Sequence, residues 1–331
     1  MILITGCNGL IGQAIAQLLL KDQRAVRAIK RKNSDLGLLR SVENQIEWIE
    51  GDILDISILE DALEGVTHVV HAAAVVSFAP SQRAEMYQVN VQGTANVVNA
   101  CLRAKTPKML FVSSVAALGR PSSPQGLPAD KPIFIDENQK WEDSPLNSHY
   151  AKSKYLAELE VWRGAAEGLA AVIVNPSIVL GEGDWTRSST QLFKYAHDEK
   201  PFYTEGFVNY VDVQDVAKAA VALLFSDIKN ERFILNAGHT TYQKLFSTMA
   251  AAFGKKAPSW RVSSALFPFI WRFEAARSWL TGKAPLITRE TAKTARSKFI
   301  FDASKLEKQL GFKFSTLEAT VERVCKNLLN K

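Results

Sequence analysis

The chain has 331 residues, of which 47% are hydrophobic and 22% are charged, and its formal net charge is +6. This composition is that of an ordinary globular protein, and it excludes a disordered chain, a coiled coil and a collagen-like fibre. The length accommodates one large α/β unit, or a core domain that carries a smaller second lobe.

Several features favour a soluble, cytoplasmic protein. No stretch reaches the roughly 20 uncharged apolar residues that span a bilayer, since the most apolar late segment, 263–281, contains three charged side chains. The N-terminus lacks the basic region and cleavage site of a signal peptide. The three cysteines are too few for a disulfide scaffold and lack metal-ligand spacing, so no metal is expected. Basic residues are scattered, so no nucleic-acid partner is expected.

Apolar runs and helical patterns alternate along the first two-thirds of the chain. Strands separated by helices imply βαβ crossovers, which build a parallel sheet with helices on both faces. Strands that are buried on both faces are continuously apolar, as these runs are. The predicted fold class is therefore α/β, a doubly wound parallel sheet with a smaller C-terminal lobe. The expected strands are 2–4, 25–29, 46–49, 67–71, 109–112 and 171–174, and the expected helices are 10–20, 56–63, 84–105 and 149–167.

The alternation becomes irregular after Pro176. Runs 208–213 and 232–235 still have the character of sheet strands, with a helix expected at 216–225 between them. The stretches 181–205 and 241–297 mix loops and helices that are rich in Trp and Phe. We therefore expect a sheet domain over 1–175, to which 206–237 return, and a lobe formed mainly by 176–205 and 238–331.

Glycines punctuate the junction between the first strand and the first helix, in Thr5-Gly6-Cys7-Asn8-Gly9-Leu10-Ile11-Gly12. They let the backbone turn tightly and let a pyrophosphate approach the helix N-terminus, where amide groups favour anions. A glycine turn alone is common, but its place before an apolar-periodic helix points to a dinucleotide site. The predicted cofactor contacts are Gly6, Asn8, Gly9, Leu10, Ile11 and Gly12.

The end of the second strand is basic, in Lys30-Arg31-Lys32, and the first acidic residue after it is Asp35. A carboxylate at this place accepts the adenosine ribose hydroxyls, whereas an arginine pairs with a 2′-phosphate. NADP is therefore favoured over NAD, with Arg31 on the phosphate. A solvated basic turn is the alternative.

Residues at two further strand ends are placed to contact the same cofactor. Asp52 and Ile53 follow the third strand and would reach the adenine. Ala72, Ala73 and Ala74 follow the fourth strand, and their small side chains would let the cofactor lie close. His71, just before them, is expected to be a strand-end histidine rather than a ligand.

Tyr150 and Lys154 lie four residues apart, on one face of a helix. A lysine beside a tyrosine stabilises the phenolate and lowers the phenol pKa from about 10, which makes the tyrosine a general acid or base. The pair alone is commonplace. However, strand 109–112 ends in Ser113-Ser114, where a serine can donate a hydrogen bond to a substrate carbonyl oxygen. A strand-end turn and a helix-start aromatic are the structural alternatives.

Together these residues resemble the extended short-chain dehydrogenases/reductases. The glycine motif at 5–12, the strand-end Ser114, and Tyr150 with Lys154 match the three diagnostic motifs of this family in order and spacing. The resemblance covers nearly the whole chain, because further matches lie at 90–94, 175–181, 210–217 and 304–312. It implies an NAD(P)-dependent oxidoreductase with a Rossmann-type sheet, in which 1–175 bind the dinucleotide and the lobe binds a small-molecule substrate.

The resemblance also implies roles for individual residues. Tyr150 would exchange a proton with the substrate oxygen, and Lys154 would lower its pKa and hold the nicotinamide ribose. Ser114, which precedes Gly119 by five residues as in the family, would orient the carbonyl. Pro176 and Ile178 would border the nicotinamide.

The same resemblance implies a homodimer. The helices that begin near Ala84 and His149 would form its interface. Asn90 resembles the asparagine that opens the family's dimer helix, where a structural role and a catalytic role are both open.

Within the family, the sequence looks closer to the dihydroflavonol-reductase and 3β-hydroxysteroid-dehydrogenase branch, which handles lipophilic ketones and alcohols. Nucleotide-sugar enzymes typically carry an arginine just before the Val-x-Asp motif, and residues 206–210 contain none, although Arg187 or Arg261 could substitute. Phe78 and Trp185 are the preferred substrate-lining residues. The other lobe aromatics suit a lipophilic pocket but are better explained as lobe core; they are Phe193, Phe207, Trp260, Phe267, Phe269, Trp271 and Trp279.

Three functions are therefore considered. The first is an NADP-dependent oxidoreductase that acts on a lipophilic carbonyl or alcohol. The second is a nucleotide-sugar epimerase or dehydratase with tightly retained NAD. The third is a non-catalytic dinucleotide-binding sensor, which the Tyr150–Lys154 pair disfavours. The expected helix at 266–280 is interpreted as a lobe helix, with contact to a membrane surface as the alternative.

Overall fold

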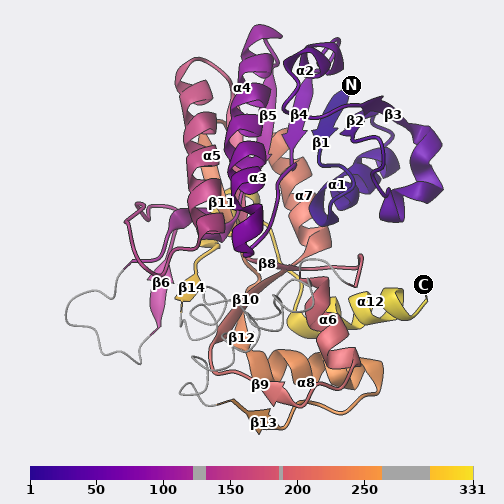
Figure 1. Ribbon diagram of the computed structural model, residues 1–331, viewed down its shortest axis with the longest axis vertical. Coiled ribbons are helices and arrows are strands. Elements are labelled where there is room, and N and C mark those ends of the chain that lie inside the picture. Colours follow the sequence, from indigo (N-terminus) through magenta and orange to yellow (C-terminus); the bar gives the residue numbers. More distant parts are fainter. Residues whose placement is uncertain (122–131, 186–188, 263–298, 331) are drawn as a thin grey trace.

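A seven-stranded parallel sheet forms the centre of the structure (Figure 1). The computed structural model describes residues 1–121, 132–185, 189–262 and 299–330. In this part of the chain the strand order is β11-β7-β5-β4-β1-β2-β3, and all neighbouring pairs are parallel. The predicted α/β class with a doubly wound parallel sheet is confirmed. The strands are β1 Ile2–Thr5, β2 Val26–Lys30, β3 Ile46–Glu50, β4 His68–His71, β5 Lys108–Val112, β7 Ala171–Pro176 and β11 Glu231–Leu235.

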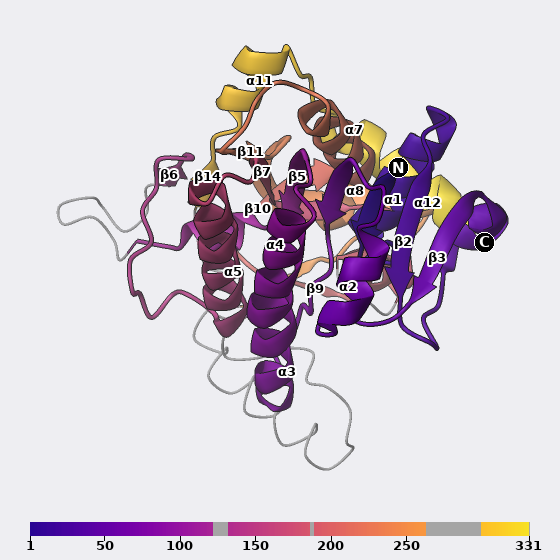
Figure 2. The same cartoon turned by 90° about the horizontal axis from the view of Figure 1, so that it is seen from above.

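Helices cover both faces of this sheet because its strands are apolar on both sides (Figure 2). On one face α1 (Leu10–Lys21) packs against α7 (Val213–Leu224). The other face carries α2 (Ile56–Ala62), α4 (Thr94–Arg103) and α5 (His149–Ala166). Successive strand residues alternate between the two cores, so Ile4 faces α1 whereas Leu3 faces α4.

Side-chain caps set where two of the functional helices begin. The Ser148 hydroxyl accepts a hydrogen bond from the Ala151 N–H, which starts α5 immediately before Tyr150. The Asp212 carboxylate accepts from the Gln214 N–H and starts α7. The position of Tyr150 in the first turn of α5 is therefore fixed by the local sequence.

The predicted long helix at 84–105 is present but is not uniform. It begins with α3 (Arg83–Tyr87), continues through a π-helical turn at Gln88–Gly93, and ends as α4. The Thr94 hydroxyl donates to the Asn90 carbonyl within this turn. Such π turns widen a helix locally and are frequent at functional sites.

A second, smaller core lies beyond the sheet. A three-stranded sheet of β8 (Ile178–Leu180), β10 (Phe207–Asp212) and β12 (Gly238–Thr241) contributes to it. Helices α6 (Thr190–His197), α8 (Tyr242–Phe253) and α12 (Leu317–Leu329) also pack there.

One expectation about the main sheet is corrected. The segment 206–237 was expected to return to the main sheet. Strand β11 joins that sheet, but β10 does not. The reason is pairing: β10 runs parallel to β8 and antiparallel to β12, which places it in the smaller sheet.

Short elements complete the described chain. The single-turn or irregular helices are Gly37–Gln45, Pro80–Gln82, Val115–Leu118 and α11 (Ser304–Leu310), and the short strand pairs are β6 (Ile133–Ile135) with β14 (Phe299–Phe301) and β9 (Phe202–Tyr203) with β13 (Trp260–Arg261). Across the described ranges, every helix is too short or too polar to cross a membrane. The helix expected at 266–280 lies outside the described residues, as do Arg187, Phe267, Phe269, Trp271 and Trp279.

Candidate active site

The glycine turn lies against the end of strand β4. Gly6 follows β1 with φ +68°, and a Cβ atom on it would lie 2.5 Å from the backbone nitrogen of Ala73. The Gly9 N–H donates to the Gly6 carbonyl at 3.0 Å, and a Cβ on Gly12 would lie 2.2 Å from that same oxygen. Side chains at Gly6 and Gly12 would fill this tight turn, so glycine is required at both positions. The turn brings backbone N–H groups to the start of α1, which fits a dinucleotide pyrophosphate.

The turn sits where the strand order reverses. From β1 the sheet continues to β2 and β3 on one side and to β4 and β5 on the other. Ligands of open parallel sheets bind at the carboxyl ends of strands at such a point. Ala72 and Ala73 leave β4 beside Gly6 and are partly buried, whereas Ala74 is exposed.

The remaining residues predicted to contact the cofactor surround this point or support it. Leu10 and Ile11 pack into the core beneath α1. Asp52 accepts a hydrogen bond from the Leu54 N–H at 3.0 Å, and Ile53 is buried against the glycine at position 93. Asn8 reaches the Asp35 carbonyl at 3.4 Å, which ties the glycine turn to the segment after β2.

Positive charge gathers after strand β2. Arg31 follows the strand and is exposed. The Asp35 carboxylate pairs with Arg40 at 2.9 Å and accepts from the Gly37 N–H at 3.1 Å. The first acidic side chain after β2 is therefore already paired. Arg40 was not singled out from the sequence, because nothing there shows that it folds back onto Asp35.

His71 is a buried, neutral link between strands and helices. Its Nδ1 lies 2.6 Å from the Thr5 hydroxyl and its Nε2 lies 2.9 Å from the Thr94 hydroxyl. The Thr94 hydroxyl donates to the Asn90 carbonyl, which cannot donate, so Thr94 must accept from Nε2–H of the histidine. Burial lowers the pKa of His71 to about 3. His71 ends β4 as predicted, and both of its ring nitrogens have hydrogen-bond partners within the protein.

The chain of hydrogen bonds continues from Asn90 to the catalytic helix. The Asn90 side chain holds both polar groups of the Val75 backbone and donates to the Ser153 hydroxyl at 3.0 Å. Ser153 in turn donates to the Tyr150 carbonyl at 2.8 Å. The cofactor end of β1 and the start of α5 are thus joined through buried polar contacts.

Tyr150 meets Ser114 at the carboxyl end of β5. Burial raises the pKa of the Tyr150 phenol above its ordinary value, and the neighbouring Ser114 hydroxyl acts more weakly in the opposite direction. The expected lowering of this pKa by Lys154 is not found. The reason is that burial dominates the pKa of Tyr150. The Lys154 ammonium donates to the Val112 carbonyl at 2.9 Å and lies 4.3 Å from the centre of the Phe111 ring.

Lys154 itself is almost fully buried, with 2% of its surface exposed. Burial lowers its pKa to about 7, and the carboxyl group of Glu158 acts in the opposite direction. Its net pKa therefore lies close to neutral pH, where a change in the surrounding charge shifts the balance between amine and ammonium.

The two predicted substrate residues lie in different surroundings. The Phe78 ring meets the Tyr150 ring edge-on, with centroids 6.1 Å apart. Trp185 instead packs against His197 and Phe253 within the lobe. Near the cofactor end, Pro176 is buried at the end of β7 and Ile178 is partly buried in β8.

Two polar residues of this region, Glu158 and Asn175, were not identified from the sequence. Glu158 lies one helical turn after Lys154, and Asn175 donates both to Glu158 at 2.5 Å and to the Ser114 carbonyl at 3.0 Å. The signal for Glu158 was its spacing, since positions 150, 154 and 158 share one face of a helix. Asn175 is the last residue but one of β7, where a polar residue near a strand end gave no indication of its partner.

Comparison with known proteins places the chain among dinucleotide-dependent enzymes. A family model described as "NAD dependent epimerase/dehydratase family" matches residues 2–238. "Sterol demethylase protein B" of Methylococcus capsulatus is 27% identical over 315 residues, which cover 93% of this chain and 92% of the relative. A protein of Synechocystis sp. that carries the provisional name dihydroflavonol 4-reductase is 28% identical over 326 residues, covering 95% and 90%.

A solved structure agrees over the full length. The crystal structure of gox2253 is 30% identical and superposes with a TM-score of 0.79, covering 100% of this chain and 98% of its own. The similarity therefore includes the lobe as well as the sheet.

Proposed function

The chain belongs to the NAD dependent epimerase/dehydratase family, and on that premise we propose that it is an NADP-dependent oxidoreductase that reduces a ketone or aldehyde of a lipophilic small molecule, or oxidises the corresponding alcohol. The family confirms the resemblance to the extended short-chain dehydrogenases/reductases and makes the chain an enzyme of that type. The finer assignments of cofactor, substrate and residue roles are proposals.

The glycine turn and the strand ends around it would hold the dinucleotide. The pyrophosphate would lie on the N–H groups at the start of α1, where side chains at Gly6 and Gly12 would block it. Arg31 would pair with the 2′-phosphate, a preference supported by the exposed position of Arg31 and by the engagement of the Asp35 carboxylate with Arg40. When bound, the nicotinamide supplies or accepts a hydride.

The further cofactor contacts are assigned by position. Asp52 and Ile53 would lie at the adenine, and Ala72, Ala73 and Ala74 would lie along the cofactor. Pro176 and Ile178 would border the nicotinamide.

The observation that carries the catalytic proposal is that the Tyr150 phenol lies close enough to the Ser114 hydroxyl, at the carboxyl edge of the sheet, for Ser114 to influence its pKa. Tyr150 would pass its phenolic proton to the substrate oxygen, and the Ser114 hydroxyl would donate to that oxygen as negative charge develops. Lys154 would hold the nicotinamide ribose and favour the phenolate through its positive charge. These roles need a protonated Lys154.

Two observations support a lipophilic substrate. Phe78 places an aromatic edge directly beside Tyr150. The relatives named above are named for a sterol and for a dihydroflavonol, which are both compounds with several fused or linked carbon rings. Trp185 stays a proposed lining residue, although its ring packs within the lobe.

A nucleotide-sugar epimerase or dehydratase is the second candidate, because the description of the family names epimerases and dehydratases. A sugar diphosphate needs cations in its pocket. Residues 206–210 supply none, and Arg261 is exposed and pairs with Glu205 at 2.5 Å. The first candidate is therefore preferred.

A homodimer through the helices that begin near Ala84 and His149 is also proposed. Helices α4 and α5 lie side by side on one face of the sheet (Figure 2). Leu159 on α5 is 43% exposed, so α5 carries an exposed apolar side chain, which borders the cavity beside this helix.

Titration of the purified protein with NADPH and NADH tests the proposal, after a check for cofactor that co-purifies. We expect loose binding that is at least about tenfold tighter for NADPH, a difference of ~1.4 kcal/mol. Arg31→Ala should abolish this preference, whereas Lys32→Ala, a matched loss of charge at the next position, should preserve it. Equal weakening of both cofactors by Arg31→Ala would remove the argument for NADP, and retained NAD would favour the second candidate.

A further inference from the structure

Glu158 is a buried acid that the proposed reaction does not use. It lies on α5 one turn after Lys154, and 1% of its side chain is exposed. An isolated carboxyl group at such a depth would lose its proton reluctantly, and burial indeed raises the pKa of Glu158. A buried acid at this place therefore needs hydrogen-bond donors.

Donors surround both carboxyl oxygens. Asn175 donates its amide to Oε1 at 2.5 Å, and Arg232 points a guanidinium nitrogen at Oε2 over 3.4 Å. The Ser113 hydroxyl and the Lys154 ammonium also favour the ionised form. Because its neighbours supply protons rather than lone pairs, the geometry favours a carboxylate.

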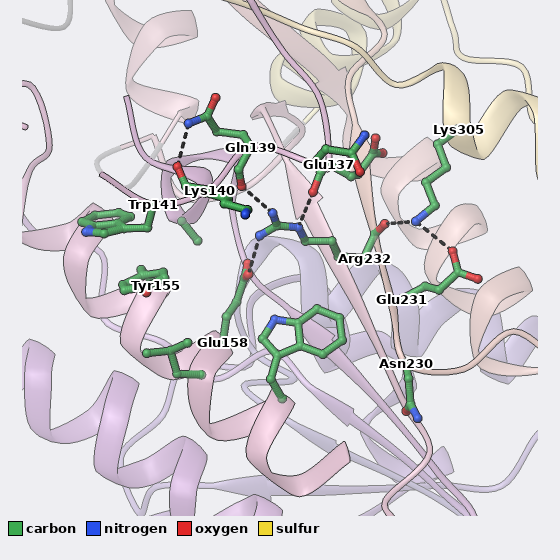
Figure 3. A pocket seen from close by; sticks show the side chains of 14 residues that line it. Glu137, Gln139, Lys140, Trp141, Tyr155, Glu158, Asn230, Glu231, Arg232 and Lys305 are labelled. Atoms are coloured by element: carbon green, nitrogen blue, oxygen red, sulfur yellow. Dashed lines mark hydrogen bonds and ion pairs between the residues drawn. The ribbon is translucent and has the colours of Figure 1, made fainter. Parts of the chain in front are cut away.

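Arg232 is held rigidly on the far side of Glu158 (Figure 3). Its Nε donates to the Glu137 carbonyl at 2.9 Å and another nitrogen donates to the Gln139 carbonyl at 2.7 Å. These residues line a cavity of about 590 Å³ beside α5, into which Glu158 and Arg232 both face. Arg232 is 19% exposed, so the ion pair extends from the buried carboxylate to the open side of the cavity.

Among the residues that the structure describes, few groups can fix the charge of Lys154. The Val112 carbonyl and the Phe111 ring contact the ammonium, but neither carries a negative charge. From β4 the neighbouring His71 is neutral, and on α5 itself Tyr150 is held in its phenol form by burial. Glu158 is the acidic group that raises the pKa of Lys154, and Arg232 from β11 acts on it through Glu158.

We propose that Glu158 is a positioning residue that keeps Lys154 in its ammonium form, and that Arg232 supports it by keeping Glu158 ionised. The importance of this interaction for catalysis rests on the proposed function, in which Lys154 acts as a cation. A buried ion pair that served folding alone would also explain the contacts, but it would leave the titration of Lys154 unchanged.

The test measures that titration directly, without cofactor or substrate. Protein labelled with [ε-13C]lysine is titrated by NMR, and the Lys154 resonance is assigned by its loss in Lys154→Met. In the wild type we expect a midpoint near pH 7, far from that of exposed lysines. In Glu158→Gln the midpoint should fall by about one pH unit or more, since a nearby opposite charge shifts a pKa by about 1–3 units.

Two further variants complete the test. Glu160→Gln removes the same charge from α5 but at a carboxylate that pairs with Arg163, and it should leave the Lys154 midpoint in place. Arg232→Gln should lower the midpoint in the same direction as Glu158→Gln, and it decides the question if Glu158→Gln does not fold. An unchanged midpoint in a folded Glu158→Gln or Arg232→Gln protein would overturn the proposal. Absence of NADPH binding would instead remove the proposed function and leave this result standing.

Discussion

Substitution of Gly6 by alanine gives a sharp test of how closely the glycine turn approaches the sheet. The new Cβ would lie 2.5 Å, 2.6 Å and 2.7 Å from three backbone atoms of Ala72 and Ala73. The shortest of these distances is about 0.9 Å less than the start of ordinary van der Waals contact at 3.4 Å. Backbone atoms at a strand end cannot rotate away, so either the turn or the end of β4 must move.

The expected loss of folding free energy in Gly6→Ala has two parts, one from the backbone conformation and one from overpacking. A left-handed backbone costs a non-glycine residue about 1–2 kcal/mol, partly offset by about 0.4–1 kcal/mol because alanine restricts the unfolded chain. Overpacking adds about 1–3 kcal/mol. The free energy of unfolding of Gly6→Ala should therefore fall by about 3 kcal/mol.

Gly65→Ala supplies the matched control. Gly65 has φ +71°, almost the angle of Gly6, but a Cβ there would meet no atom within 4 Å. It carries the backbone part alone, so its loss should be about 1 kcal/mol or less. Urea unfolding followed by tryptophan fluorescence measures both variants, and NADPH titration should show at least a tenfold loss for Gly6→Ala alone, ~1.4 kcal/mol. Equal losses of stability would refute the close approach of the turn to β4.

Three further outcomes are expected. Tyr150→Phe should lower turnover of an accepted ketone by about 10²–10⁴-fold and leave NADPH binding nearly unchanged; full turnover would contradict the catalytic assignment. The free energy of unfolding of the wild type should fall as the pH drops below 6.5, by about 2 kcal/mol at about pH 5. In the unfolded chain this histidine binds a proton over that range, whereas buried His71, with its pKa of about 3, does not. His71→Gln should flatten this profile in urea unfolding. Arg323→Met should cost about 3 kcal/mol because it strands two largely buried carboxylates, whereas Arg103→Met, at a surface pair, should cost about 1 kcal/mol or less.

The sheet was predictable because its strands are buried on both faces. The main sheet contains all six strands that were predicted before residue 175, and it also contains the predicted strand at 232–235. The run 208–213 has the same apolar character but joins a different sheet. Strand pairing is decided by partners distant in sequence, here β8 and β12, and those partners are too short to stand out by pattern.

The site was predictable where function demands a residue type at a fixed place in a local element. The glycines, Ser114 and Tyr150 lie at the ends of strands or the starts of helices, and Lys154 follows one helical turn after Tyr150. The structure brings Ser114 and Tyr150 together. Groups whose behaviour depends on burial were not predictable. The raised pKa of Tyr150 and the lowered pKa of Lys154 both arise from desolvation, which a sequence does not display.

Burial also explains why a residue outside the recognised motifs can control one inside them. On an exposed helix, a glutamate one turn from a lysine changes little, since water screens the pair and their attraction is worth a few tenths of a kcal/mol. Lys154 and Glu158 have the same spacing but are almost wholly excluded from water. Desolvation brings the pKa of Lys154 to about 7, where a modest change in the surrounding charge decides how much ammonium is present. The buried face of α5 that packs onto the sheet is therefore also the surface on which the charge of the catalytic lysine is set.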